Sequence, residues 1–296
     1  MRNVSDYPAR IEKLYALLNP CRLCPHSCGV NRLAGQKGKC RTGTNVLVSS
    51  HNIHHGEEPP ISGVAGSGTI FFANCSLSCV YCQNYPISQG GNGNNVTIAE
   101  LAGMMLSLQE RGAHNINLVT PSHVAPMAVE AVYAARTGGL KLPIVYNCSG
   151  YESLETLALL DGIVDIYLPD AKYGDDAAAL KFSGAPGYRE INKAALKEMH
   201  RQVGTLAADE NGIAKRGLII RHMALPNNLS GSRKVFEFIA RELSPETYVS
   251  IMAQYHPAHR AGEYAELSRR LTAGEYELTL AAAKDFGIEN GWQQEL

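Results

Sequence analysis

"GTIFFANCSLSCVYCQN", residues 68–84, joins a short apolar run to a loop that holds three cysteines within eight positions, Cys75, Cys79 and Cys82. The apolar run predicts a buried strand, and the cysteine loop follows directly at its carboxyl end. In α/β barrels the chemistry sits at that end of the strands. The stretch therefore predicts both a barrel-like α/β fold and the position of its site.

The three cysteines suit an iron–sulfur cluster with one open position. A cubane cluster has four irons, and each iron needs one ligand beyond its bridging sulfides. Three cysteines on one loop would hold three irons and leave the fourth iron open to an exogenous ligand. Two alternatives remain: three structural thiols, or a zinc ion whose fourth ligand is a nearby histidine, His51, His54, His55 or His123. The spacing favours the open cluster.

Five further apolar runs continue the pattern of the first. They are NINLVT (115–120), LPIVYN (142–147), GIVDIYL (162–168), RGLIIRHMALP (216–226) and TYVSIMAQY (247–255). Continuous apolar strands of this kind are typical of a parallel sheet that is covered on both faces. Helical patterns lie between the runs, which gives six strand–helix units, two short of a complete barrel. We therefore predict an α/β fold, a partial (β/α)6 TIM-like barrel.

Helix start signals support this alternation. Thr97 and Glu100 form a predicted capping box, and Thr272 and Glu275 form another, each at the start of a helical pattern. The dipeptide at residues 211–212, Asn-Gly, predicts the turn of an inserted hairpin. Further helices are predicted over residues 126–137, 154–160 and 235–243.

A second cysteine group precedes the barrel. Cys21, Cys24, Cys28 and Cys40 are separated by two, three and eleven residues, in a segment too poor in apolar residues to build a core of its own. Four thiolates close a metal site, and either zinc or an auxiliary iron–sulfur cluster fits this spacing. We favour zinc or another structural metal.

Composition narrows the class of protein. The 296 residues carry a formal net charge of −1, so no global field draws the chain to nucleic acid or to an anionic membrane. The N-terminus has no signal-peptide core, and no stretch approaches the roughly 18 apolar residues of a membrane span. We expect a cytoplasmic protein, where clustered cysteines are ligands more often than disulfides. We divide the chain into a Cys-rich N-terminal metal-binding appendage, residues 1–60, and the partial barrel, residues 61–296.

The Cys-x3-Cys-x2-Cys loop, with Tyr81 before its last cysteine, resembles the radical S-adenosylmethionine superfamily. Within it, the chain resembles the group related to pyruvate formate-lyase activating enzyme, through GEEPPISGVAGSGTIFFANCSLSCVYCQNYPIS (56–88), the upstream cysteine block, RHMALP (221–226) and QYHPAH (254–259). The resemblance implies a [4Fe-4S] cluster on the three cysteines whose open iron chelates S-adenosylmethionine. Reductive cleavage would give a 5′-deoxyadenosyl radical that abstracts hydrogen. A reducing electron donor such as flavodoxin or ferredoxin is implied as a partner.

Polar residues at the ends of the predicted strands are the candidates for cofactor binding, because the adenosyl group must be oriented and enclosed. Asp170 and Lys172 would take the methionine ammonium and carboxylate, by resemblance to the Asp-x-Lys of the activating enzymes; the alternative is a surface ion pair. Of the neighbours Arg221 and His222, only one can face into the barrel. The other candidates are Tyr81, Thr120, Ser122, His123, Asn147, Ser149, Gln254, Tyr255 and His256.

The implied activity is that of an oxidoreductase that activates a glycyl-radical enzyme by taking hydrogen from a glycine of that partner. One departure concerns the substrate: the activating enzymes commonly carry Gly-Gly-Glu-Pro after the second strand, and this chain has TPSH at residues 120–123. Two alternatives stay open. The radical enzyme would act on a small molecule or peptide, or the chain would be a non-catalytic iron–sulfur electron-transfer protein. We expect no membrane and no nucleic-acid partner.

Overall fold

One large sheet organises the protein in the computed structural model, which describes residues 4–296. The strand order is β10-β9-β8-β6-β5-β4-β2-β1-β3, and β7 pairs with β8 beside this path. The strands are Val46–His54 (β1), Ser67–Phe72 (β2), Asn94–Val96 (β3), Ile116–Val119 (β4), Ile144–Cys148 (β5), Ile166–Pro169 (β6), Ala207–Ala208 (β7), Ala214–Met223 (β8), Tyr248–Met252 (β9) and Gly291–Gln293 (β10).

The six predicted strands are β2, β4, β5, β6, β8 and β9, and each is parallel to the next in this order. The mixed α/β fold with a mostly parallel sheet is therefore confirmed, and the open strand order fits a partial TIM barrel. Both edges extend further than predicted. β10 adds a parallel strand beyond β9, while β1 and β3 add antiparallel strands beyond β2.

The N-terminal segment shares the main sheet and core. β1 ends at His54 and pairs with β2 through partners such as Asn52 and Thr69. Tyr7 and Leu14, in the first helix, belong to the same buried cluster as the central strands. The division of the chain at residue 60 stays a prediction, and the structure shows contacts that run across it.

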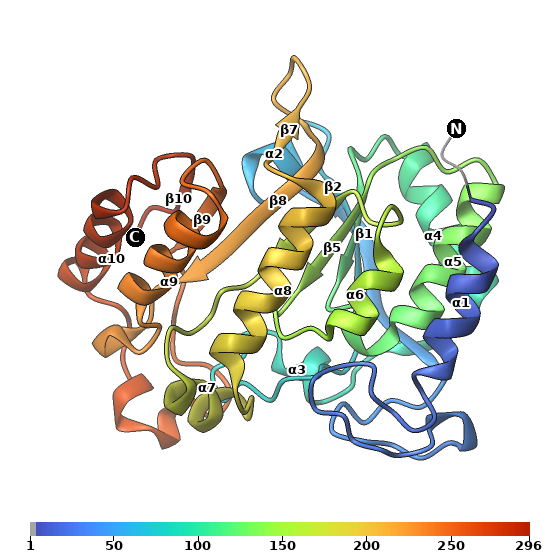
Figure 1. Cartoon of the computed structure of the whole chain (residues 1–296), viewed down its shortest axis with the longest axis horizontal. Helices are drawn as coiled ribbons and strands as arrows, with labels where there is room; N and C mark the ends of the chain where they lie inside the picture. Colours follow the sequence, from blue (N-terminus) through green and yellow to red (C-terminus); the bar gives the residue numbers. More distant parts are fainter. Residues whose placement is uncertain (1–3) are drawn as a thin grey trace.

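Helices alternate with the strands. The capping boxes of Thr97 with Glu100 and of Thr272 with Glu275 are both present, and the turn at Gly212 joins β7 to β8. The helices are Tyr7–Ala16 (α1), Pro59–Ser62 (α2), Tyr85–Ser88 (α3), Ile98–Glu110 (α4), Ala125–Thr137 (α5), Leu154–Leu160 (α6), Asp176–Ser183 (α7), Tyr188–Val203 (α8), Ser232–Phe238 (α9) and Ala273–Asp285 (α10). In Figure 1 the β7 hairpin projects from one end of the sheet, and α3, α7 and the N-terminal loop lie at the opposite end.

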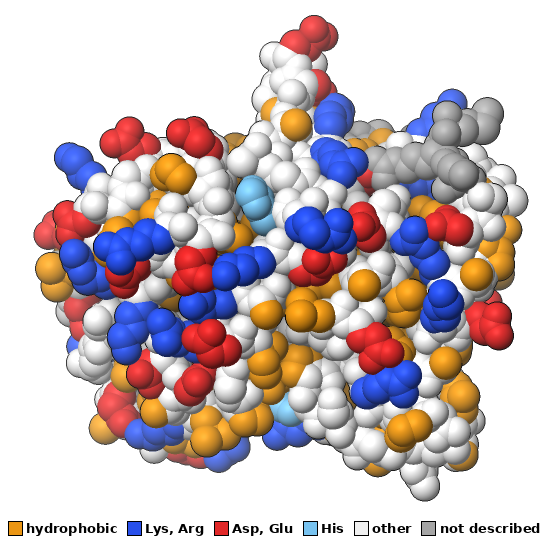
Figure 2. All heavy atoms as spheres, viewed as in Figure 1, with side chains coloured by type: hydrophobic (Ala, Val, Ile, Leu, Met, Phe, Trp, Pro, Cys, Tyr) orange, Lys and Arg blue, Asp and Glu red, His pale blue; other side chains and the backbone are white. Residues whose placement is uncertain are grey.

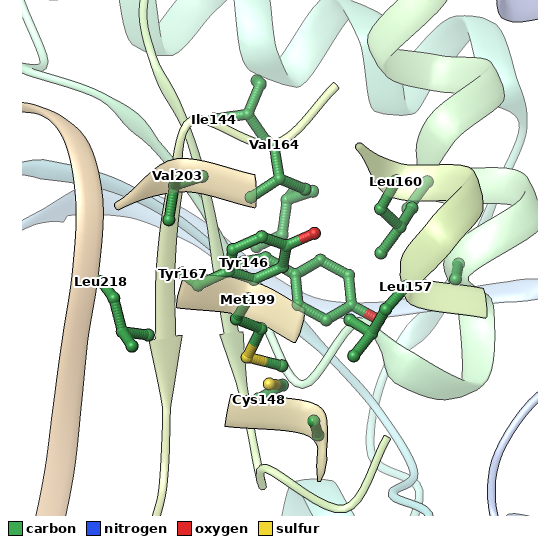
Figure 3. Packing of buried hydrophobic residues seen from close by; sticks show 14 of the residues in the cluster. Ile144, Tyr146, Cys148, Leu157, Leu160, Val164, Tyr167, Met199, Val203 and Leu218 are labelled. Atoms are coloured by element: carbon green, nitrogen blue, oxygen red, sulfur yellow. The ribbon is translucent and has the colours of Figure 1, made fainter. Parts of the chain in front are cut away.

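Both faces of the central strands are buried, as their continuous apolar runs predict. Tyr146 of β5 and Tyr167 of β6 pack edge to face with ring centroids 5.9 Å apart, beside α6 and α8 (Figure 3). Such a pair contributes about 0.5–1.5 kcal/mol beyond its burial. Their strand neighbours Val145 and Ile166 face the other side and form a separate buried cluster with Ile219. The sheet therefore has a helix-covered face and an inner face.

The surface carries charges of both signs. On the face in Figure 2, Lys and Arg side chains alternate with Asp and Glu, which agrees with the net charge of −1. Within residues 4–296, every helix is too short or too polar to cross a membrane.

Candidate functional site

A cavity of about 430 Å³ lies at the carboxyl ends of the central strands. Its lining includes the three cysteines of residues 74–84 and most of the polar candidates from the strand ends. From the predicted set these are Cys75, Cys79, Cys82, Tyr81, Thr120, Asn147, Ser149, Asp170, Lys172, Arg221 and Gln254. A larger hollow of about 600 Å³ lies beside α7 and α9 and is lined by none of them. The chemistry therefore points to the smaller cavity.

Each cysteine of the triad receives a polar contact at its sulfur. The Leu77 amide donates to Cys75 Sγ at 3.4 Å, and the Ser183 hydroxyl of α7 donates to Cys79 Sγ at 3.0 Å. The third contact joins Cys82 Sγ and the Ser88 hydroxyl of α3 at 3.1 Å. Hydrogen bonds to the ligating sulfurs are one of the means by which a protein tunes an iron–sulfur cluster.

The chemistry of the triad suits a cubane cluster, in which each thiolate binds a different iron. Among residues 4–296, no group of three His, Cys, Asp or Glu side chains is arranged to hold a single metal ion. Burial raises the pKa of Cys75 to about 12 and that of Cys79 to about 11, so both thiols keep their protons at neutral pH until a metal displaces them. The residues present fit the implied [4Fe-4S] group.

Backbone strain marks the edge of the cavity. Asn74, directly after β2, has φ 72°, and Thr120, directly after β4, has φ 61°. Asparagine adopts this left-handed region fairly readily, but a β-branched threonine rarely does, and such strain of about 1–3 kcal/mol tends to collect at functional sites. The turns at these two positions redirect the chain as it leaves the sheet. The sequence identified residues 120–123 only by their polar side chains and gave no sign of the turn at Thr120.

Asp170 and Lys172 form an ion pair inside the cavity, with Lys172 Nζ 2.6 Å from Asp170 Oδ2. Their side chains are only 21% and 19% exposed, so the alternative of a surface pair does not describe them. Burial alone would lower the pKa of Lys172, but the Asp170 carboxylate outweighs burial and raises it. Lys172 therefore carries its positive charge at the cavity wall over the whole physiological range.

Helix α8 fixes the strand ends that carry these groups. The Tyr188 hydroxyl donates toward the carbonyls of Ser149 and Asp170, at 3.0 and 3.2 Å. Asn192 donates to the carbonyls of Gly150 and Asp170, at 3.0 and 2.9 Å. At Gly150 a Cβ would lie 2.1 Å from the Asp170 oxygen, so the close approach of the β5 and β6 ends requires glycine there. No sequence signal identified α8 as a support for the site.

Arg221 enters the cavity and is held by two carboxylates that sequence reasoning missed. Its Nε lies 2.6 Å from Glu58 Oε1, and its Nη2 lies 2.8 Å from Glu58 Oε2; Glu57 pairs with the same guanidinium. Burial opposes ionisation of Glu58, but Arg221 outweighs burial and holds the pKa of Glu58 below its usual value. The sequence GEEPP gave no sign that the two glutamates belong to the site, because Arg221 lies 163 residues after Glu58.

Several predicted residues do not line the cavity. Ser122 donates to Glu152 Oε1 at 2.5 Å, and His123 contacts the Ala73 carbonyl at 2.9 Å, both in the buried interior. His222 lies on the helix side of β8, where its nitrogens contact the Ala171 carbonyl and the Ser232 hydroxyl at 2.7 and 2.9 Å. Alternation along a strand is the reason, because Arg221 already takes the inner face. Tyr255 and His256 are also outside the set of lining residues.

Tyr81 belongs to a buried cluster of tyrosines behind the triad. Its hydroxyl lies 2.6 Å from that of Tyr173, which lies 2.7 Å from the Ser183 hydroxyl. Ser183 in turn donates to Cys79. Tyr81 therefore lines the cavity and also supports one cysteine of the triad through two hydroxyl groups.

The segment that carries the four N-terminal cysteines contacts the triad loop, since His26 donates to the Ser76 carbonyl at 2.9 Å. After burial, the charges of Cys40 and Cys21 contribute to raising the pKa of Cys24, which reaches about 12. Cys28 Sγ accepts a hydrogen bond from the Lys39 amide at 3.3 Å. The second metal site at these four cysteines stays a prediction.

The comparisons with known proteins bear on the fold and the family. No protein-family model matches the sequence. The chain is 31% identical over 299 residues to the uncharacterized protein MJ0674 of Methanocaldococcus jannaschii, which covers 97% of this chain and 80% of that protein. SuiB of Streptococcus suis, bound to S-adenosylmethionine, is similar with a TM-score of 0.53 at 11% identity, over 75% of this chain and 48% of SuiB. A second SuiB structure gives a TM-score of 0.50 at 12% identity, over 75% and 47%. The chain spans about half the length of SuiB, and this likeness shows the fold.

Proposed function

This chain belongs to the same family as the protein MJ0674 of Methanocaldococcus jannaschii, and from that premise we propose that it is a radical S-adenosylmethionine enzyme. The observation that carries the proposal is the cysteine triad, which opens into a cavity at the strand ends with each sulfur in a polar contact. Three thiolates leave one iron of a cubane without a protein ligand. A non-catalytic electron carrier would need no cavity beside that open position.

The cavity residues suit the polar end of the cofactor. Asp170 offers a carboxylate to the methionine ammonium, and Lys172 offers a cation to the methionine carboxylate. Asn147 and Thr120 add neutral hydrogen-bonding groups at neighbouring strand ends. When bound, the [4Fe-4S] cluster and S-adenosylmethionine would supply a 5′-deoxyadenosyl radical, and the surrounding residues would exclude water from it.

Arg221 has a positioning role in this proposal. Its guanidinium is already paired with Glu57 and Glu58, so it holds the segment before α2 against the end of β8. Its Nη1 also lies 3.5 Å from Asn147 Oδ1. Arg221 therefore orients one cavity side chain and closes one wall.

The size of the cavity supports a substrate that reaches in from outside. About 430 Å³ is at the low end of the roughly 300–1,000 Å³ usual for ligand pockets, so one cofactor of this size leaves little room for a second molecule. A glycine on a partner protein would need little room. In its most specific form, the proposal is therefore that the enzyme abstracts hydrogen from a glycine of a glycyl-radical enzyme, with flavodoxin or ferredoxin as the electron donor. The alternative substrate is a small molecule or a peptide.

The test is production of 5′-deoxyadenosine. The anaerobically reconstituted, reduced protein should convert S-adenosylmethionine to 5′-deoxyadenosine and methionine, measured by chromatography, while a Cys79→Ala variant should not. No product above that control, with a broad set of candidate substrates, would support the electron-carrier alternative.

A second measurement addresses the substrate. With a candidate glycyl-radical enzyme present, the reaction should give a persistent EPR doublet that is lost when the acceptor glycine of the partner is replaced. Turnover of a small metabolite with no doublet in any partner would reject the activating role and leave the radical chemistry intact.

A further inference from the structure

We propose that Glu57 determines which substrate the cavity accepts, because its carboxylate receives a cationic group of that substrate, an ammonium or a guanidinium. This group would enter the part of the cavity that lies away from the triad, which we call the Glu57 end. The binding of a cation there stands on the structure alone, whereas its identity as part of the substrate rests on the proposed function.

The cavity has one more carboxylate than its own cations neutralise. Its lining carries the carboxylates of Glu57, Glu58 and Asp170 and the cations of Lys172 and Arg221. Lys172 pairs with Asp170 at 2.6 Å. The Arg221 guanidinium meets both oxygens of Glu58, with Nε at 2.6 Å and Nη2 at 2.8 Å, in the two-pronged geometry that suits this pair best. Glu57 therefore carries the remaining negative charge, although one of its oxygens also contacts Arg221.

Glu57 is deeply buried but incompletely bonded. Its side chain is only 7% exposed. Its backbone amide donates to the Ser62 hydroxyl at 3.0 Å, which fixes the residue, and its Oε2 contacts Arg221. Within residues 4–296, Oε1 has no hydrogen-bond partner and is not sealed off from the cavity that Glu57 lines. A carboxylate oxygen with so little access to water forms its strongest hydrogen bonds with charged donors.

The Glu57 end lies opposite the triad. β1 ends at His54, which pairs with Ser67, the first residue of β2, whereas the triad follows the last residue of β2. Helix α2 follows the two glutamates directly and lies near the β7 hairpin, away from α3 (Figure 1). Asp170 and Lys172, which we assign to the cofactor, follow β6 at the triad end. The Glu57 end is therefore left for a small group of the substrate.

Two aromatic rings border the open side of the cavity. Phe71 of β2 and Trp292 of β10 both line the cavity, yet their strands lie near opposite ends of the strand order. The open sheet must therefore curve around the cavity and bring the two rings to the borders of its gap. The face of a Trp or Phe ring attracts a cation. The rings and the Glu57 carboxylate therefore favour the same class of group.

The cofactor itself supplies a competing cation. S-adenosylmethionine carries a sulfonium, which would also gain from a nearby carboxylate. The position of Glu57 away from the triad favours the substrate, and the two cases predict different results for cofactor binding when Glu57 is replaced.

Trp292 is the single tryptophan of the chain, so its fluorescence reports on the cavity. We choose n-butylguanidinium as the probe and add it to the reconstituted full chain, kept unreduced, with S-adenosylmethionine present. The probe should change the emission saturably. Pentanamide and pentanoate, which carry a neutral and an anionic group on the same butyl chain, should bind about ten-fold more weakly or less. Equal affinity for the three probes would overturn the proposal, and no variant is needed that might fail to fold.

A further probe separates a peptide source of the cation from a small molecule. N-acetylarginine amide carries the same guanidinium on a peptide backbone. Because the proposed substrate is a protein, this compound should bind more tightly than n-butylguanidinium. Equal or weaker binding would overturn the assignment to a peptide and leave a small cationic molecule as the substrate.

Glu57→Gln should weaken n-butylguanidinium binding about ten-fold and leave the affinity for S-adenosylmethionine unchanged. The matched control is Glu237→Gln, because Glu237 pairs with Arg241 and lines only the other hollow. A loss of cofactor affinity as large as the loss of probe affinity would assign Glu57 to the sulfonium and overturn the proposal. Neither measurement needs turnover, so a protein that makes no 5′-deoxyadenosine but binds the cation would reject the proposed function and keep the cation site.

Discussion

Arg221 and His222 are neighbours on β8, yet they lie in two different regions of the molecule. Arg221 faces the cavity and is bound by the carboxylates of Glu57 and Glu58. His222 faces α9, packs against the Phe236 ring at 5.0 Å and contacts a backbone carbonyl and a hydroxyl. The cavity side of the strand ends therefore carries paired charges, and the helix side carries neutral polar groups. A polar residue after a strand acquires its role from the face on which it lies.

The largest expected effect is a loss of stability when the charged group on the cavity side, Arg221, is removed. Arg221→Ala removes the partner of two buried carboxylates, which should lower the free energy of unfolding by about 3–5 kcal/mol, measured by urea titration followed by circular dichroism. Glu58→Gln added to Arg221→Ala should recover part of this loss. Equal stability of Arg221→Ala and the parent chain would show that the pair is not part of the folded cavity.

The helix side should respond to pH. Burial lowers the pKa of His222 to about 4, whereas an unfolded histidine titrates near 6.5. Below pH 6.5 the histidine is protonated in the unfolded chain but stays neutral in the folded chain. The contribution of neutral His222 to the free energy of unfolding is therefore complete above pH 6.5 and is lost as the pH falls toward 4. The loss should reach about 3 kcal/mol.

The variant that isolates this effect is His222→Gln, which keeps hydrogen-bonding groups but does not titrate. Its unfolding free energy should fall less steeply than that of the parent chain between pH 6.5 and 4. His55→Gln, at an exposed position, serves as the control. Parallel pH profiles for all three chains would remove His222 as the source.

A smaller effect is expected on cofactor binding from the cavity side. Lys172→Met should weaken S-adenosylmethionine binding by about ten-fold, or about 1.4 kcal/mol, measured by equilibrium dialysis. The control is Lys234→Met, since Lys234 forms an exposed ion pair with Asp175 outside the cavity. The same affinity in both variants would place the Asp170–Lys172 pair outside the binding site.

The smallest expected effect concerns the strained turn after β4. Thr120→Gly relieves the left-handed backbone but adds freedom to the unfolded chain, so the unfolding free energy should change by no more than about 1 kcal/mol. Thr120→Ala, which keeps the strain and loses the hydroxyl, separates the two contributions. If the hydroxyl serves the cofactor, both variants should weaken binding equally; weakening by glycine alone would assign the role to the backbone.

The sequence allows the strands and the triad to be predicted because their signals are local. Apolar runs define β2, β4 and β9, and the cysteine spacing defines the triad loop. The face of a residue could be predicted only as an alternative, as with Arg221 and His222. The carboxylates that pair with Arg221 could not be predicted, because no local pattern links residues 163 positions apart. Strand β10 was missed because three residues of mixed polarity give no periodicity.

The first helix has a consequence for the order in which the protein is made. Tyr15 of α1 bonds to Glu130 at 2.6 Å, 115 residues later, and Arg10 bonds to the Asp161 carbonyl, 151 residues later. A ribosome releases the chain from the N-terminus at about 5–20 residues per second. Helix α1 is therefore synthesised many seconds before Glu130 and Asp161, and the cysteines that follow α1 lack their folded surroundings for the same interval. The free thiols of residues 21–40 can oxidise during that interval, so we expect that the nascent segment must stay reduced until α5 and α6 have emerged.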